Sequence, residues 1–142
     1  MTVKQISILL ENKPGKLSQV SDLLGKEGIN IGSLSLSESA DSTLVRIIAD
    51  NPDKALQVLK NAGHHCWEVD VVAVVTPDHP GGLNAVLKPL SSGGVNVDYL
   101  YAFLRRWQDN AIIIFRVDDT PKALEILKKN YIQVLGDDLY SL

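Results

Sequence analysis

Two short stretches decide the fold of this chain. Residues 12–17 read NKPGKL and residues 78–83 read DHPGGL, so the Pro-Gly pair recurs after 66 residues. The same offset of 66 carries residues 28–31, GINI, onto residues 94–97, GVNV. Two blocks that recur in order at one spacing indicate an internal duplication.

A third block extends the duplication toward the end of the chain. Residues 50–60 match residues 118–128, there with an offset of 68. About two residues are therefore inserted in the second repeat, most simply in a loop near residues 105–110. Because the repeats fill nearly all of the chain, we expect two units, residues 1–68 and residues 69–142.

Both repeats show the same succession of hydrophobic patterns. Alternating apolar residues predict strands, and apolar residues at helical spacing predict helices. The first repeat reads strand, helix, strand, strand, helix, strand over residues 6–10, 14–25, 29–37, 44–49, 52–62 and 66–69. The second reads the same over residues 69–75, 80–91, 95–103, 111–117, 121–130 and 132–135. This order predicts an α+β protein made of two tandem ferredoxin-like βαββαβ units, each with an antiparallel sheet.

Composition excludes several classes of protein. The 142 residues carry a net charge of −3 and are 45% hydrophobic, which does not suit a disordered chain. A slightly acidic chain has no general attraction for nucleic acid, and no apolar run is long enough for a membrane helix. The first residues lack the pattern of a signal peptide, and a single cysteine excludes an intrachain disulfide. We therefore expect a cytoplasmic protein with no nucleic-acid or membrane partner.

The second strand of the second repeat is apolar on both faces. Val97, Tyr99 and Tyr101 lie on one face, and Leu100 and Ala102 lie on the other. A strand of this kind needs a second covering surface besides its helices. The pattern predicts packing between units and a homodimer.

The turn before the first helix of each repeat is the best chemical candidate. The first turn of a helix leaves backbone N–H groups without partners and is partly positive, which suits a carboxylate. Asn12 and Asp78 stand two residues before the prolines, and their side-chain oxygens can accept hydrogen bonds from a ligand ammonium group. Such a turn suits a small zwitterion such as an amino acid. The same residues also make an ordinary helix start, with Asn12 or Asp78 as the cap.

Asn30 and Asn96 are a second repeated feature, since each follows a glycine at the start of a predicted strand. In this topology that strand begins at the end of the sheet opposite the Pro-Gly turn. We expect these side chains to face a site on a neighbouring unit. The alternative is a turn side chain that bonds its own backbone.

Together, the turn and the Gly-x-Asn block resemble an ACT domain, and they occur twice over nearly the whole chain. The resemblance implies a regulatory module that binds a small ligand, most often an amino acid, between the strand–helix loop of one unit and the second strand of its neighbour. In the first repeat it places the site on Asn12, Pro14, Gly15, Lys16, Leu17, Asn30 and Ile31. In the second repeat it places the site on Asp78, Pro80, Gly81, Gly82, Leu83, Asn96 and Val97. Asp78 suits an ammonium group better than Asn12, and Gly82 leaves more room than Lys16.

ACT units usually accompany a catalytic domain, and here they fill the chain. The leading hypothesis is a non-catalytic amino-acid sensor without a cofactor. A regulatory subunit that acts by contact with an enzyme on another chain is the alternative, with residues 105–107 as one contact. A small enzyme is a third hypothesis, but no acid, base or nucleophile cluster supports it. His64, His65 and Cys66 are adjacent, unlike the ligands of a zinc site, so we expect no metal.

Overall fold

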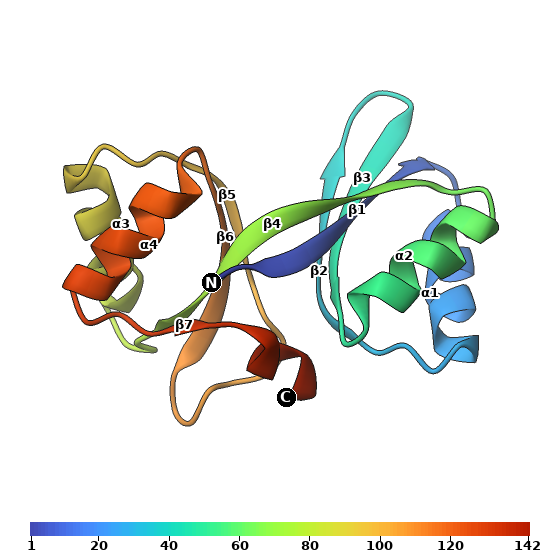
Figure 1. Cartoon of the computed structure of the whole chain (residues 1–142). Coiled ribbons are helices and arrows are strands. Elements are labelled where there is room, and N and C mark those ends of the chain that lie inside the picture. Colours follow the sequence, from blue (N-terminus) through green and yellow to red (C-terminus); the bar gives the residue numbers. More distant parts are fainter. The chain divides into compact units, whose positions relative to one another are not determined.

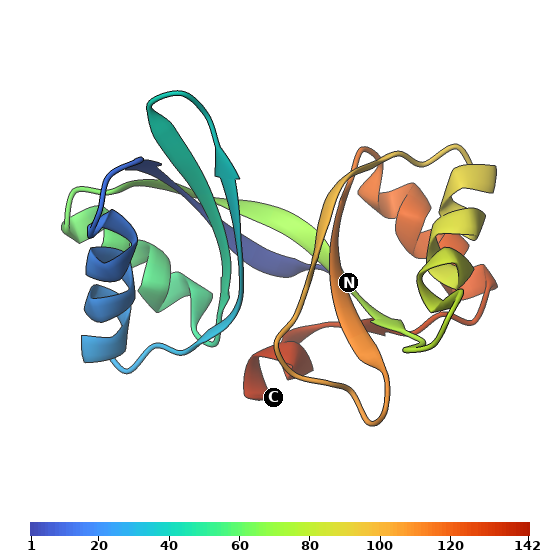
Figure 2. The ribbon, with the colours of Figure 1, turned by 180° about the vertical axis from the view of Figure 1, so that it is seen from behind.

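The computed structural model describes residues 1–142, which form two compact units. The N-terminal unit comprises Lys4–Val69. The C-terminal unit comprises Asp70–Leu142 together with Met1–Val3. Each unit places two helices on one face of an antiparallel sheet, as both ribbon views show (Figures 1 and 2).

The N-terminal unit follows the predicted order of elements. These are β1 (Val3–Glu11), α1 (Lys16–Lys26), β2 (Ile31–Glu38), β3 (Ser42–Ala49), α2 (Pro52–Asn61) and the start of β4 (His65–Thr76). Its strands lie in the order β2-β3-β1-β4. The register pairs Val45 of β3 with Ile8 on one side and Leu36 on the other. Apolar side chains of three neighbouring strands therefore share the sheet face that the helices cover.

The C-terminal unit repeats this arrangement. It contains the rest of β4, α3 (Gly82–Ser92), β5 (Val97–Ala102), β6 (Ala111–Val117), α4 (Thr120–Lys129), β7 (Val134–Leu135) and a 3₁₀ helix (Asp137–Ser141). β4 pairs with both β6 and β7, and β5 pairs with β6, which gives the order β7-β4-β6-β5. The predicted α+β fold of two tandem ferredoxin-like βαββαβ units is confirmed.

The second helix of each unit begins in the same way. Asn51 accepts a hydrogen bond from the Lys54 N–H at 3.2 Å, and Asp119 accepts one from the Lys122 N–H at 3.1 Å. A proline stands at the start of both helices, where its missing N–H costs nothing. The duplication seen in the sequence is thus also visible in the capping of the helices.

Several element boundaries differ from the predicted ones. The helix expected from Pro14 begins at Lys16, because Gly15 has a left-handed φ of 86° that ends the turn. The two strands expected on either side of Val69 are a single twelve-residue strand, β4. The last strand is only Val134–Leu135. The insertion is where we expected it, in the β5–β6 hairpin, whose end is closed by a bridge between Trp107 and Asn110.

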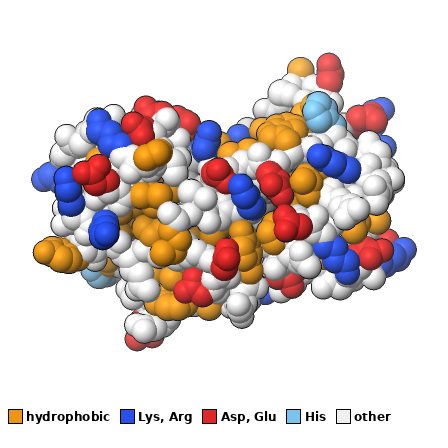
Figure 3. Space-filling model, in the orientation of Figure 1, with side chains coloured by type: hydrophobic (Ala, Val, Ile, Leu, Met, Phe, Trp, Pro, Cys, Tyr) orange, Lys and Arg blue, Asp and Glu red, His pale blue; other side chains and the backbone are white.

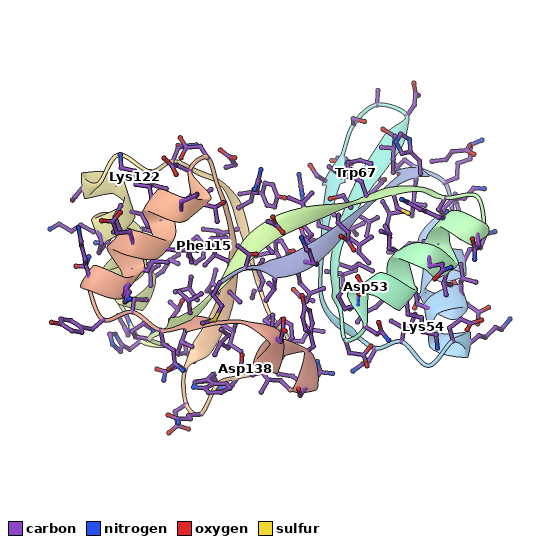
Figure 4. The ribbon with its side chains drawn as sticks, viewed as in Figure 1. Asp53, Lys54, Trp67, Phe115, Lys122 and Asp138 are labelled. Carbon is purple, nitrogen blue, oxygen red and sulfur yellow. The ribbon has the colours of Figure 1, made fainter.

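Each unit has its own apolar core. In the N-terminal unit, Ile6, Ile8 and Val45 of the sheet pack with Leu24 of α1 and Leu59 of α2, all fully buried. The C-terminal core contains the corresponding residues and one larger side chain, Phe115 of β6. It lies between the sheet and the helices α3 and α4 (Figure 4). Burial of such side chains supplies most of the favourable free energy of folding.

The second strands expose apolar side chains. In β5, Tyr101 is buried while Leu100 is 38% exposed, and Leu104 beyond the strand is 67% exposed. In β2, Leu34 is 43% and Leu36 53% exposed. A register shift between Val97 and Tyr99 places Val97 on the same face as Leu100, so the expected face of Val97, Tyr99 and Tyr101 is wrong for Val97. On the molecular face in Figure 3, basic and acidic side chains are interspersed among apolar ones.

Cys66, the single cysteine, lies in β4 and belongs to the core of the N-terminal unit. Burial raises the pKa of its thiol, and Lys60 opposes this only in part. We expect the native protein at pH 8 to react with a thiol reagent more slowly than the protein in urea, since the side chain is buried and the thiolate is the reactive form. The absorbance of released thionitrobenzoate measures both rates. Equal rates would contradict a buried thiol.

Candidate functional site

The first Pro-Gly turn joins β1 to α1. Gly15 is the N-cap residue of α1, and no side chain bonds the first turn of the helix. The capping role considered for Asn12 is therefore absent. Backbone N–H groups at the start of α1 remain available to an anion, and the helix dipole favours negative charge there.

A small cavity of about 130 Å³ opens beside this turn. It brings together the end of β1, the turn, the first turn of α1 and the far end of the β2–β3 hairpin. Its lining residues are Leu10, Glu11, Asn12, Lys13, Lys16, Leu17, Leu36, Thr43 and Val45. The cavity has an apolar wall from the strands and a polar rim from the turn, the combination found in small-molecule sites.

The Asn12 side chain is exposed and makes no hydrogen bond in the structure. Its backbone N–H donates to the Asp41 carbonyl at 3.3 Å, which ties the turn to the β2–β3 hairpin. This bond holds the backbone while the amide group stays free. The amide oxygen can accept a hydrogen bond from an ammonium group, and the amide nitrogen can donate one to a carboxylate.

Three charged side chains surround the first turn. Glu11 forms an ion pair with Lys13 at 2.9 Å and lies 3.9 Å from Lys16. The hydrogen bond and charge of Lys13 lower the pKa of the Glu11 carboxyl, and the same pair raises the pKa of the Lys13 ammonium group. Two cations against one carboxylate leave this turn with a surplus of positive charge, which attracts an anionic group.

The second Pro-Gly turn joins β4 to α3 and has the same backbone form. Gly81 is the N-cap residue with a left-handed φ of 84°, again without a side-chain cap. Its acidic side chain, however, is engaged. The Arg106 guanidinium, from the inserted hairpin, contacts the Asp78 carboxylate at 2.8 Å.

Gly82 does not leave the room that we expected. It is buried, and a Cβ atom at this position would lie 1.9 Å from the carbonyl oxygen of Pro77. In the first repeat the matching residue, Lys16, has room for its Cβ atom. In the second repeat the backbone of Pro77 fills that space. The missing side chain serves close packing of the loop against α3.

The remaining expected site residues lie apart from the first-repeat cavity. Asn30 and Ile31, at the start of β2, do not line it. The Asn30 N–H donates to the Asp50 carboxylate at 3.0 Å, and the Asn96 N–H donates to that of Asp118 at 2.9 Å. The Asn96 side-chain amide donates to the Asp98 carboxylate at 3.1 Å and so does not bond its own backbone.

The other second-repeat residues occupy matching places. Pro80, like Pro14, is exposed within the turn, and Leu83 is 40% exposed on α3, as Leu17 is 36% exposed on α1. Val97 begins β5 and is partly buried against the core of its unit. Gly81 also borders an open groove along α3 with Asn84, Lys88 and Asn130 among its walls.

Sequence reasoning missed two parts of this region. The cavity wall formed by Leu36, Thr43 and Val45 comes from the far end of the β2–β3 hairpin, and only the strand register brings it to the turn. The contact of Arg106 with Asp78 spans 28 residues. The insertion in the β5–β6 hairpin marked Arg106 as a candidate contact residue, but it did not indicate that the partner is Asp78.

Two general features of the structure bear on other functions. No group of three or more His, Cys, Asp or Glu side chains comes together as metal ligands do. No helix has the length and apolar character needed to cross a bilayer.

The fold and the paired turns define a tandem ferredoxin-like protein with two strand–helix Pro-Gly turns. The chain belongs to the ACT domain family: the family described as an ACT domain pair matches residues 1–142. The resemblance noted in the sequence is confirmed. With TM-score 0.93 and 38% identity, the structure is similar to protein BT0572 from Bacteroides thetaiotaomicron, over 100% of this chain and 98% of that one.

More distant similarities accompany this match. The regulatory subunit of aspartate kinase from Thermus thermophilus shares the fold with TM-score 0.64 at 16% identity, over 90% of this chain and 92% of that one. A probable acetolactate synthase small subunit from Archaeoglobus fulgidus is 40% identical over 58 residues, 39% of this chain. The match spans 36% of the length of that curated relative.

Proposed function

We propose that this protein is a non-catalytic regulatory protein that binds a free amino acid at the first Pro-Gly turn. The observation that carries this proposal is the cavity at that turn, with an unbonded Asn12 amide beside an uncapped helix start. The N–H groups of α1 and the surplus cation attract the ligand carboxylate. The Asn12 oxygen accepts from the ligand ammonium group.

The proposal includes completion of the site by a second unit. A cavity of about 130 Å³ is smaller than the roughly 300–1,000 Å³ typical of small-molecule sites. Leu36, at its edge, is 53% exposed and gives a neighbouring surface an apolar place to pack. The proposed units are residues 1–68 and 69–142, and the proposed assembly is a homodimer in the cytoplasm. Asn30 and Ile31 would then serve a site on a neighbouring unit.

Regulation follows from such a site by population shift. A ligand held by two units binds only when both are in place, so its binding energy favours that arrangement. The names of the regulatory subunit of aspartate kinase and the acetolactate synthase small subunit support a regulatory role.

A thermal-shift screen with each of the twenty amino acids tests the proposal. A ligand at 100 times its dissociation constant stabilises the native state by about 2.7 kcal/mol, which raises the melting temperature by about 5–10 °C for a protein of this size. We expect one amino acid, or a chemically related group, to give such a shift. A flat response to all twenty would refute amino-acid binding.

Asn12→Ala locates the binding site. Since the side chain has no partner in the structure, its removal leaves the melting temperature of the free protein unchanged. Loss of one ligand hydrogen bond weakens binding by about 5–10-fold. Asn61→Ala, at the exposed end of α2, is the matched control and retains full affinity. Equal affinities for the two variants would place the ligand elsewhere.

A regulatory subunit that acts by contact with a separate enzyme is the second candidate function. The similarity to an acetolactate synthase small subunit favours it. Affinity purification of the tagged protein from its native cells, followed by mass spectrometry, separates the two candidates. A stoichiometric enzyme partner supports the second candidate, and a homo-oligomer without a partner contradicts it.

A further inference from the structure

The two Pro-Gly turns share a backbone form but differ in what holds them. In the first repeat the neighbouring hairpin holds the turn through a backbone bond, from the Asn12 N–H to the Asp41 carbonyl. In the second repeat a side chain from the hairpin holds the turn. Arg106 contacts the Asp78 carboxylate at 2.8 Å through Nη1 and donates from Nη2 to the Asp109 carbonyl.

Arg106 contacts the carboxylate of the second turn to which a ligand ammonium group would bind. The Asp78 carboxylate is the group in the second turn best suited to an ammonium ion, and a cation of the same chain already contacts it. The second contact, to Asp109, orients the guanidinium within its own hairpin. Because Arg106 is tethered, a free ligand must compete with it at a high effective concentration.

The backbone of the second turn is also held more tightly, while the start of α3, like that of α1, has no side-chain cap. The Gly82 N–H donates to the His79 carbonyl at 2.8 Å, whereas the matching Lys16 N–H lies 3.4 Å from the Lys13 carbonyl. Gly82 packs directly against the Pro77 carbonyl, so the loop and the start of α3 are closely packed. The first turn has the looser bond and the cavity, and the second turn borders the open groove along α3.

The two turns also differ in the charged groups that surround them. Near the first turn, Lys13 and Lys16 share one carboxylate, Glu11, so positive charge is left for a ligand carboxylate. Near the second turn, Asp78 and Arg106 neutralise each other. The duplication has therefore produced one turn with a free Asn12 amide and one turn whose Asp78 carboxylate is paired with Arg106.

We propose that Arg106 closes the second turn, so that the chain binds its amino acid at the first turn. This inference rests on the proposed function and adds which repeat binds more tightly and what weakens binding at the other. Both side chains of the pair are about half exposed, and such a pair changes an equilibrium constant by at most about five-fold. The Arg106–Asp78 contact therefore opposes ligand binding only weakly, and the close packing at Gly82 adds to this effect.

Amide NMR of the full-length protein tests the inference. Gly15 and Gly81 provide one ¹⁵N–¹H probe for each turn. The ligands are glycine, which has no side chain for the cavity to reject, and the amino acid with the largest thermal shift. We expect Gly15 to reach half-saturation at a concentration at least about five-fold below that of Gly81. In Arg106→Gln, the value for Gly81 falls by about two- to five-fold and that for Gly15 is unchanged.

Arg105→Gln is the matched control, because it removes the neighbouring positive charge and leaves the contact with Asp78 in place. It should leave both half-saturation values as in the wild type. Equal responses of Gly15 and Gly81 in the wild type would overturn the inference and leave the proposed function standing. So would an unchanged Gly81 response in Arg106→Gln. If neither glycine responds to any of the twenty amino acids, the proposed function fails and the inference fails with it.

Discussion

Gly82→Ala is expected to destabilise the C-terminal unit by about 3 kcal/mol or more. The added Cβ would lie 1.9 Å from the Pro77 carbonyl oxygen and 2.8 Å from its carbon, distances at which the backbone must move. Because Gly82 is the first residue of α3, the displacement would separate the loop from the helix. Urea unfolding in a Trp67→Phe background measures this loss, since Trp107 then remains as the single tryptophan and reports on the C-terminal unit.

Gly25→Ala is the control for this substitution. Gly25 lies in α1, does not require a left-handed backbone, and a Cβ atom added to it would have no neighbouring atom within 4 Å. Alanine should therefore stabilise the N-terminal unit by about 0.5–1 kcal/mol, measured in a Trp107→Phe background in which Trp67 reports on that unit. A Gly82→Ala protein whose free energy of unfolding lies within about 1 kcal/mol of the wild-type value would contradict the close packing of the second turn.

Phe115→Ala is expected to cost about 3–5 kcal/mol in the same unit. Phe115 is 1% exposed and packs against Val86 and Leu90 of α3 and Leu127 of α4. Truncation leaves a cavity between the sheet and both helices, and a closely packed core recovers little of the lost contact. Calorimetry and urea unfolding measure the change.

The duplication supplies the control for Phe115. The corresponding residue of the first repeat is Ile47, which pairs with Ile6 as Phe115 pairs with Val72. Phe115→Ile keeps a branched apolar side chain of the kind that this position holds in the other unit. It should cost only about 1–2 kcal/mol. Equal losses for the alanine and isoleucine variants would show that the cost is set by the aromatic ring and not by the cavity.

Most of the fold was predictable because its signals are local. The alternation of Ile6, Ile8 and Leu10 predicts a strand with one buried face, and all three side chains are buried. The helix α2 begins at Pro52 as predicted, with Asn51 as its cap. Boundaries were less accurate where a backbone angle decided them. A sequence does not display the φ of 86° at Gly15, which delays α1 until Lys16.

The candidate site was predictable only as a place in the chain. The Pro-Gly repeat located both turns, and the uncapped start of α1 agrees with an anion-binding role. The opposite wall of the cavity was not predictable, because Leu36 and Thr43 reach it through the pairing of β2, β3 and β1. The position of Asn30 away from that cavity was predicted, because β2 begins at the end of the sheet opposite the Pro-Gly turn.

The sequence by itself determined the duplication, the α+β class and the ACT family, because periodicity and repeated motifs are properties of residues close together in the chain. Only the tertiary structure decided how the two turns differ. Arg106 meets Asp78 across 28 residues, and Gly82 packs on the Pro77 carbonyl. Both contacts depend on where the folded backbone places atoms, so two motifs that read almost alike are left with different polar groups free.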